Sequence, residues 1–197
     1  MANSWPELCN RALLIVGADT IMDLEEESPS AQACKLLLPG TLDSVLRSHE
    51  WSCAEAVVSL AADSTAPTIG FSYRYLLPVD PWALKVRKVC DEDGNEYEYT
   101  VRGRYVETNC SAPAKIVITK RIEDPTEVDA LCADVLVLRL AADLAGKIVS
   151  SQSMRDEFMK EYARQLAHAA AVDSNEINRS RTVDSGWLTT RGYTGAS

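Results

Sequence analysis

The stretch that decides the fold is VDALCADVLVLRLAADLAGKIV, residues Val128–Val149. Nearly every position in it is apolar, apart from two early aspartates and a later polar series formed by Arg139, Asp143 and Lys147. Their four-residue spacing places these three side chains on one face of a helix. A helix with so little polar surface must be covered on most sides, by helices of its own chain or by a neighbouring subunit.

A further helix is predicted after this stretch. Met154, Phe158, Tyr162 and Leu166 recur at helical spacing and form one apolar stripe, which Ala169 or Ala170 continues. Polar residues occupy the remaining positions, as expected for a helix that buries a single face.

Two more helices are expected near the N-terminus. Ser4-Trp5-Pro6-Glu7 is typical of a helix start, and Gly17 of a helix end. Ser28-Pro29-Ser30 starts a second helix that should end near Ser48. Pro39-Gly40 lies inside this second helix and should bend or interrupt it, because proline lacks an amide hydrogen.

The region between these helix pairs has the pattern of an antiparallel sheet. Its short segments are rich in aromatic and β-branched residues and are separated by Pro, Gly, Asp and Asn. Turns are predicted at 91–95 and at Arg102-Gly103-Arg104, and the interval from Lys85 to Ile118 is predicted to be a meander. The predicted strands are Tyr73–Leu76, Ala83–Val89, Tyr97–Val101, Tyr105–Thr108 and Lys115–Thr119.

The order of elements favours the α+β class. We expect a four-helix bundle built from both chain ends, residues 1–50 and 123–177. An antiparallel β-sheet, residues 51–122, is inserted between its halves. Residues 178–197 are small and polar and should form a flexible C-terminal tail.

Charge and composition limit the function classes. The net charge of −9 is spread unevenly, with −7 over residues 1–65, +2 over 66–122, −6 over 123–178 and +2 over 179–197. Acidic outer segments argue against a DNA-binding module, which needs clustered cations to bind phosphates. No segment reads as a signal peptide or a membrane-spanning helix, so a protein made in cytoplasm is expected.

No cofactor or metal site is predicted. The six cysteines are scattered without a C-x-x-C pair and are expected to be reduced thiols, and only two histidines accompany them. Phosphate-binding glycine loops, zinc-hydrolase motifs and a serine-esterase motif are absent from the sequence.

The candidates for catalysis have ordinary structural explanations. His49 and Cys53 suggest a base and a nucleophile, yet the sequence indicates no third orienting group. Paired carboxylates at 25–27, 91–93 and 156–157 are expected in a loop, a hairpin tip and a first helical turn. We therefore predict no enzymatic activity. A tail-associated hydrolase of cell wall or polysaccharide stays open as an alternative, because the sequence contains enough paired carboxylates for such an enzyme.

Taken together, the pattern resembles the tail tubular protein A family, the head-to-tail adaptors of short-tailed bacteriophages. Glu50 departs from the proline usual in that family, and the likeness spans residues 4 to about 176. The matching segments are Leu8-Cys-Asn-Arg-Ala-Leu-Leu, Leu42–Trp51, Gly70–Asp80, Ala112-Pro113 and Val128–Ala145 with its Leu-Arg-Leu-Ala-Ala-Asp-Leu-Ala core.

The resemblance implies a ring of twelve copies between the portal protein and the tail nozzle protein. Genomic DNA would pass through the ring without specific binding, and no membrane is involved. The expected location is the head-tail junction of the virion, after assembly in the host cytoplasm. A head-completion or tail-terminator connector of a long-tailed phage is a second alternative.

Three surfaces are hypothesised for these contacts. The sheet, with Tyr73, Tyr75 and Trp82, is the hypothesised outer or nozzle-facing surface. The candidate subunit-interface residues are Leu131, Val135, Leu138 and Ala142. The candidate portal-contact residues are Arg179, Arg181, Trp187, Leu188 and Arg191.

Overall fold

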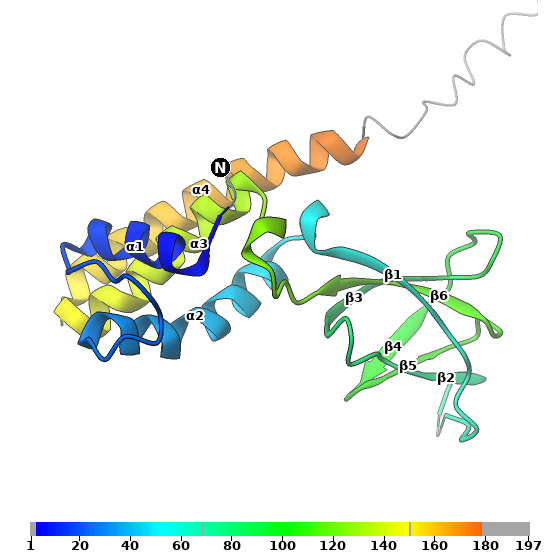
Figure 1. The fold of residues 1–197 in the computed structure, drawn as a ribbon. Helices are drawn as coiled ribbons and strands as arrows, with labels where there is room; N and C mark the ends of the chain where they lie inside the picture. The colour runs from blue at the N-terminus through cyan, green and yellow to red at the C-terminus, as the bar shows by residue number, and fades with distance from the viewer. Residues whose placement is uncertain (1–2, 68, 150, 179–197) are drawn as a thin grey trace, which may run out of the picture.

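The computed structural model describes residues 3–67, 69–149 and 151–178 and has a mixed α+β fold. Four helices lie together in a helical part, and six strands form a sheet part beside it (Figure 1). Both ends of the described chain belong to the helical part, and the strands come from the middle of the sequence. Among the described residues, no helix has the length and apolar character needed to cross a bilayer.

The helix boundaries follow from local capping. The helices are α1 (Trp5–Val16), α2 (Pro29–Ser48), α3 (Ala130–Leu144) and α4 (Gln152–Asn178), with short helical turns η1 (Ser52–Ala54), η2 (Pro125–Glu127) and the π-helical η3 (Ala145–Val149). Ser4 and Ser28 each accept a backbone hydrogen bond at a helix start, and Gly17 ends α1 with a φ of 72°. These predicted ends are confirmed, and α2 runs unbroken through Pro39.

Helix α3 is covered by helices of its own chain. It packs against α1, α2 and α4, and most of its side chains lie in the core. Val135 and Ala142 are fully buried there, so their assignment to a subunit interface was wrong. Leu131 and Leu138 are half-buried against the same core.

The strands form two sheets, which corrects the prediction of one. Strand order is β1-β6-β3 in one sheet and β2-β5-β4 in the other, all antiparallel. The predicted meander is therefore wrong, because β3 pairs with β6. The strands are β1 (Glu55–Leu60), β2 (Tyr73–Leu76), β3 (Ala83–Cys90), β4 (Tyr99–Arg102), β5 (Tyr105–Thr108) and β6 (Ala114–Lys120).

Burial explains why β3 pairs with β6. Val86 lies opposite Ile118, and Val89 lies opposite Ile116, and all four side chains are buried. These cross-strand pairs remove branched side chains from water, which a local meander would not do. The turn at 91–95 is confirmed, although only a single bridge, Cys90 with Glu96, follows it.

The sequence interpretation missed β1, an edge strand paired with β6. Ala56, Val58 and Leu60 alternate along it and pack against the core of the sheets. None of them is fully buried, so the apolar signal is weak. The hairpin between β4 and β5 is confirmed, and Gly103 supplies its positive φ of 63°.

Tyr75 lies in the core of the sheet part, contrary to its assignment to an outer surface. Its side chain is fully buried, and its hydroxyl donates to the Cys110 carbonyl oxygen at 2.8 Å. Tyr73 and Trp82 keep about a third of their surface in water. Burial raises the pKa of Tyr75 to about 12, since the phenolate would lose its hydration.

The raised pKa of Tyr75 predicts a loss of stability at alkaline pH. The stabilisation is complete below the ordinary tyrosine pKa near 10 and is lost as pH rises toward 12. Between pH 9 and pH 11.5 we expect Tyr75 ionisation to lower the free energy of unfolding by about 2 kcal/mol. Urea unfolding of the wild type and of Tyr75→Phe at both values measures this difference. An equal pH dependence in the two proteins contradicts the prediction.

Polar contacts join the helical part to the sheet part. Arg121 on the sheet side forms a bidentate ion pair with Asp43 of α2. Arg47 of α2 donates to the Leu84 carbonyl oxygen at 2.8 Å, and Lys85 pairs with Glu50 at 3.1 Å. The C-terminal half of α2 therefore docks on β3.

Candidate functional site

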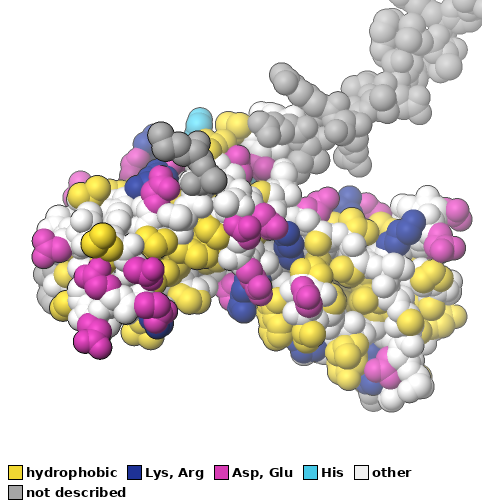
Figure 2. All heavy atoms as spheres, in the orientation of Figure 1, with side chains coloured by type: hydrophobic (Ala, Val, Ile, Leu, Met, Phe, Trp, Pro, Cys, Tyr) yellow, Lys and Arg dark blue, Asp and Glu magenta, His cyan; other side chains and the backbone are white. Residues whose placement is uncertain are grey.

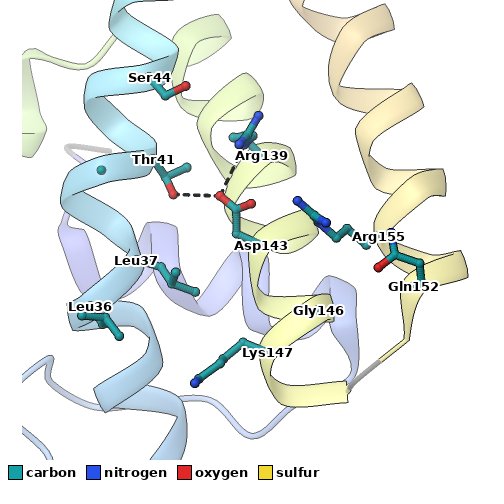
Figure 3. Close-up of a pocket in the computed structure, with 11 residues that line it drawn as sticks. Leu36, Leu37, Thr41, Ser44, Arg139, Asp143, Gly146, Lys147, Gln152 and Arg155 are labelled. Carbon is teal, nitrogen blue, oxygen red and sulfur yellow. Dashed lines mark hydrogen bonds and ion pairs between the residues drawn. The ribbon is translucent and has the colours of Figure 1, made fainter.

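A hollow of about 550 Å³ lies where α2, α3 with η3, and α4 meet (Figure 3). One side comes from α2, the floor from the end of α3 and from η3, and the far side from the start of α4. The lining residues are Leu36, Leu37, Gly40, Thr41, Ser44, Arg139, Asp143, Gly146, Lys147, Gln152 and Arg155.

The polar series predicted on one face of α3 lies in this hollow. Asp143 accepts a hydrogen bond from the Thr41 hydroxyl at 3.1 Å and pairs with Arg139 at 3.3 Å. Asp143 is thereby neutralised by a cation of its own helix and fixed by α2, as the dashed lines in Figure 3 show. The sequence-based placement of Arg139, Asp143 and Lys147 on one face is confirmed.

Two cations of the hollow have unpaired side chains within the part of the chain that the structure describes. The side chains of Lys147 and Arg155 make no hydrogen bond or ion pair there, and both residues are exposed. With Arg139 and Asp143 included, the lining carries three positive charges and one negative charge. In a chain of net charge −9, this hollow is a local excess of positive charge.

Arg155 lies close to Gly146 of the π-helical turn. A β-carbon at Gly146 would lie 3.4 Å from Cδ of Arg155, which is an ordinary van der Waals contact. Such turns widen a helix locally and recur at functional positions. The sequence interpretation did not single out Arg155, because the other residues that line the hollow come mostly from other helices.

A larger hollow, about 680 Å³, lies between the two parts and is also rich in cations. There the charged side chains bind partners within the same chain. Arg121 pairs with Asp43, Lys85 pairs with Glu50, and the Arg104 guanidinium lies 4.1 Å from the centre of the Trp82 ring. Arg47 is bound to the Leu84 carbonyl oxygen. These contacts hold the fold together and leave little charge for a ligand.

In the structure, Asp173 orients His49, which the sequence did not indicate. Its Nε2 lies 2.9 Å from Oδ2 of Asp173 on α4, and the Ser52 hydroxyl donates to Oδ1 at 2.6 Å. The serine therefore donates to the carboxylate and not to the histidine. This arrangement links α4 to the chain that follows α2 and lacks the relay of a nucleophilic site.

Cys53 is likewise not activated by His49. Among the described residues, His49 is hydrogen-bonded to Asp173 and not to Cys53. A hydrogen bond from the Cys132 thiol lowers the pKa of Cys53 to about 7, while burial and the carboxylates of Asp129 and Asp173 oppose this shift. Half-buried Cys53 thus contacts Cys132, which is fully buried in the core of the helical part.

The acidic pairs find structural partners. Glu25 pairs with Lys35, Asp91 accepts hydrogen bonds from Asn95 that lower the pKa of Asp91, and Asp156 accepts from Gln152. Within residues 3–67, 69–149 and 151–178, no group of three His, Cys, Asp or Glu residues could hold a metal ion.

The predicted portal-contact residues lie outside the described residues. This applies to the set Arg179, Arg181, Trp187, Leu188 and Arg191. In comparisons with known proteins, no family model and no curated protein matches the chain.

Proposed function

We propose that the chain is a structural subunit of a closed ring that joins the portal of a short-tailed phage to its tail nozzle. The proposal rests on the sequence resemblance. The structural observation that carries it is apolar surface left uncovered on both parts of the molecule. A subunit in a head-to-tail ring buries two different faces, so exposed apolar side chains on separated elements support this role.

The exposed apolar side chains belong to several elements. They occur on α1, α2, the connection between them, three of the strands and the loops of the sheet part, and Figure 2 shows large hydrophobic areas on the sheet part. Residues of this kind usually mark interfaces when they gather, whereas single ones are ordinary. The set is Leu14, Ile15, Met22, Leu36, Val57, Ile69, Tyr73, Leu76, Val79, Trp82, Tyr97 and Val101.

In this proposal the helical part is a four-helix bundle built from both chain ends. Its acidic surface faces the DNA channel, because like charge keeps phosphates from binding the wall. The sheet part, with Tyr73 and Trp82, faces outward or toward the nozzle. Half-buried Leu131 and Leu138 stay candidates for a contact between copies. Residues 178–197, including Trp187, are proposed to bind the portal.

Assembly state is the direct test of this function. We expect the purified full-length protein, alone or after addition of portal protein, to form closed rings with a mass of many chains, twelve by the resemblance. Sedimentation velocity and electron microscopy measure this. Removal of residues 178–197 should leave ring formation intact and weaken portal binding. A protein that stays monomeric in the presence of portal, or a virion map that locates it away from the DNA exit path, contradicts the proposal.

The two alternatives predict different results. A hydrolase would clear cell-wall or polysaccharide substrate in a zymogram or turbidity assay, and the adaptor would leave it unchanged. A head-completion or tail-terminator protein would assemble with the components of a long tail. Its ring symmetry would differ as well.

A further inference from the structure

The connection between α1 and α2, residues 17–28, holds an apolar side chain in water. Met22 at its tip is 94% exposed. Ile21 beside it is buried. The Asn10 side-chain amide donates to the Ile21 carbonyl oxygen and accepts from the Ile21 amide, each at 2.8 Å. The Met22 amide donates to Glu26 at 3.1 Å. The loop is therefore fixed by its own hydrogen bonds while its tip stays uncovered.

The same loop is the most acidic segment of the chain. Residues 19–27 hold five carboxylates and no cation. Figure 2 shows acidic side chains gathered over the end of the helical part, where this loop lies. One of them, Glu25, pairs with Lys35, and another, Glu26, accepts the hydrogen bond from the Met22 amide. An apolar tip in an acidic setting fits a surface with an apolar centre and a basic rim.

The hollow between α2, α3 and α4 is such a surface. Leu36, 73% exposed, lines it and also lines a second hollow of about 480 Å³ that shares Lys147 with the first. Lys147 and Arg155, whose side chains are unpaired within the described residues, line the same hollow as this exposed leucine, with Arg155 on the opposite side (Figure 3). The surface made by both hollows, here called the Leu36 surface, has the opposite charge to the loop.

The loop and the Leu36 surface lie on different sides of α2. Lys35 faces the loop and binds Glu25, whereas Leu36, Gly40 and Ser44 follow at four-residue spacing along the other side. The two surfaces thus point in different directions from one helix. Contact between them therefore requires two copies. A contact between unlike surfaces repeats from copy to copy, and it closes a ring when the rotation between neighbours divides a full turn.

We propose that Met22 and its acidic loop insert into the Leu36 surface of a second copy, with Lys147 and Arg155 pairing with the loop carboxylates. The inference rests on the ring proposed above and specifies which surfaces of neighbouring subunits meet. A rigid loop favours such a contact, because little conformational freedom is lost when it binds.

Two complementary variants test the contact. One has an altered loop, Met22→Lys, and the other an altered hollow, Lys147→Glu with Arg155→Glu. Under conditions in which the wild type assembles, each variant alone should raise the concentration for half-assembly at least about tenfold. Mixed in equal amounts, they should form pairs and no larger species, because only one good contact remains. Sedimentation velocity separates these states.

Matched controls and the opposing results complete the design. Lys160→Glu, a charge reversal on exposed α4, and Met22→Leu should assemble as the wild type does, and circular dichroism should match throughout. Normal assembly of either altered variant, or a mixture that stays monomeric, overturns the contact while the wild-type rings still support the ring. A wild type that never assembles, even with portal, overturns both.

Discussion

Replacing Trp51 by alanine is expected to lower the free energy of unfolding by about 4 kcal/mol, within the usual range for buried tryptophan. Its side chain is 1% exposed and belongs to the core of the helical part. The indole Nε1 donates to the Val45 carbonyl oxygen at 2.9 Å, near the end of α2, where carbonyls lack helical partners. The substitution therefore opens a cavity and removes a buried hydrogen bond.

Urea unfolding followed by circular dichroism measures the effect of Trp51→Ala. Trp82→Ala is the matched control, because Trp82 is 36% exposed and its loss should cost much less. Equal losses for the two variants would contradict the assignment of Trp51 to the core. The packing of the His49 ring edge against Trp51, with ring centres 5.0 Å apart, should also be lost.

The second large effect is expected at Arg87, where replacement by methionine should cost about 3 kcal/mol. The side chain is 3% exposed and binds three other segments of the chain. It donates to the Trp51 carbonyl oxygen at 2.7 Å and to the Thr119 hydroxyl at 2.9 Å, and it pairs with Glu55. Methionine fills similar space and leaves buried acceptors without a donor.

Two comparisons identify the cause at Arg87. Arg87→Lys keeps the charge but cannot make three directed contacts, so an intermediate loss is expected. Lys88→Met alters a neighbouring exposed ion pair with Glu96 and should cost no more than about 1 kcal/mol. If Arg87→Met is as stable as Lys88→Met, the three contacts of the Arg87 side chain do not stabilise the protein.

Trp51 and Arg87 show when a sequence pattern indicates burial and when it does not. Trp51 follows an apolar helix, where a tryptophan is usually buried. Arg87 lies within a predicted strand, and nothing in its neighbours indicates that it is buried. Its acceptors lie at residues 51, 55 and 119, so only the packing of three segments defines its role.

Of the candidate site, likewise, one part follows from the sequence pattern and the rest only from the tertiary structure. The common face of Arg139, Asp143 and Lys147 follows from helical spacing, and the structure confirms it. Arg155, Thr41 and Leu36 join them from other helices, and Asp173 reaches His49 across 124 positions. Similarly, Val135 has the pattern of an interface residue, but α1, α2 and α4 cover helix α3 and leave Val135 buried.

The sequence alone determined the helix ends and most strand segments, since caps, turns and apolar periodicity act between residues only a few positions apart. It also determined that α3 must be buried. Only the tertiary structure decided that the strands form two sheets, that β3 pairs with β6, and that Lys147 and Arg155 line one hollow with Leu36. These features depend on contacts between distant segments, and the choice among such contacts is made by the total surface buried, which no local pattern contains.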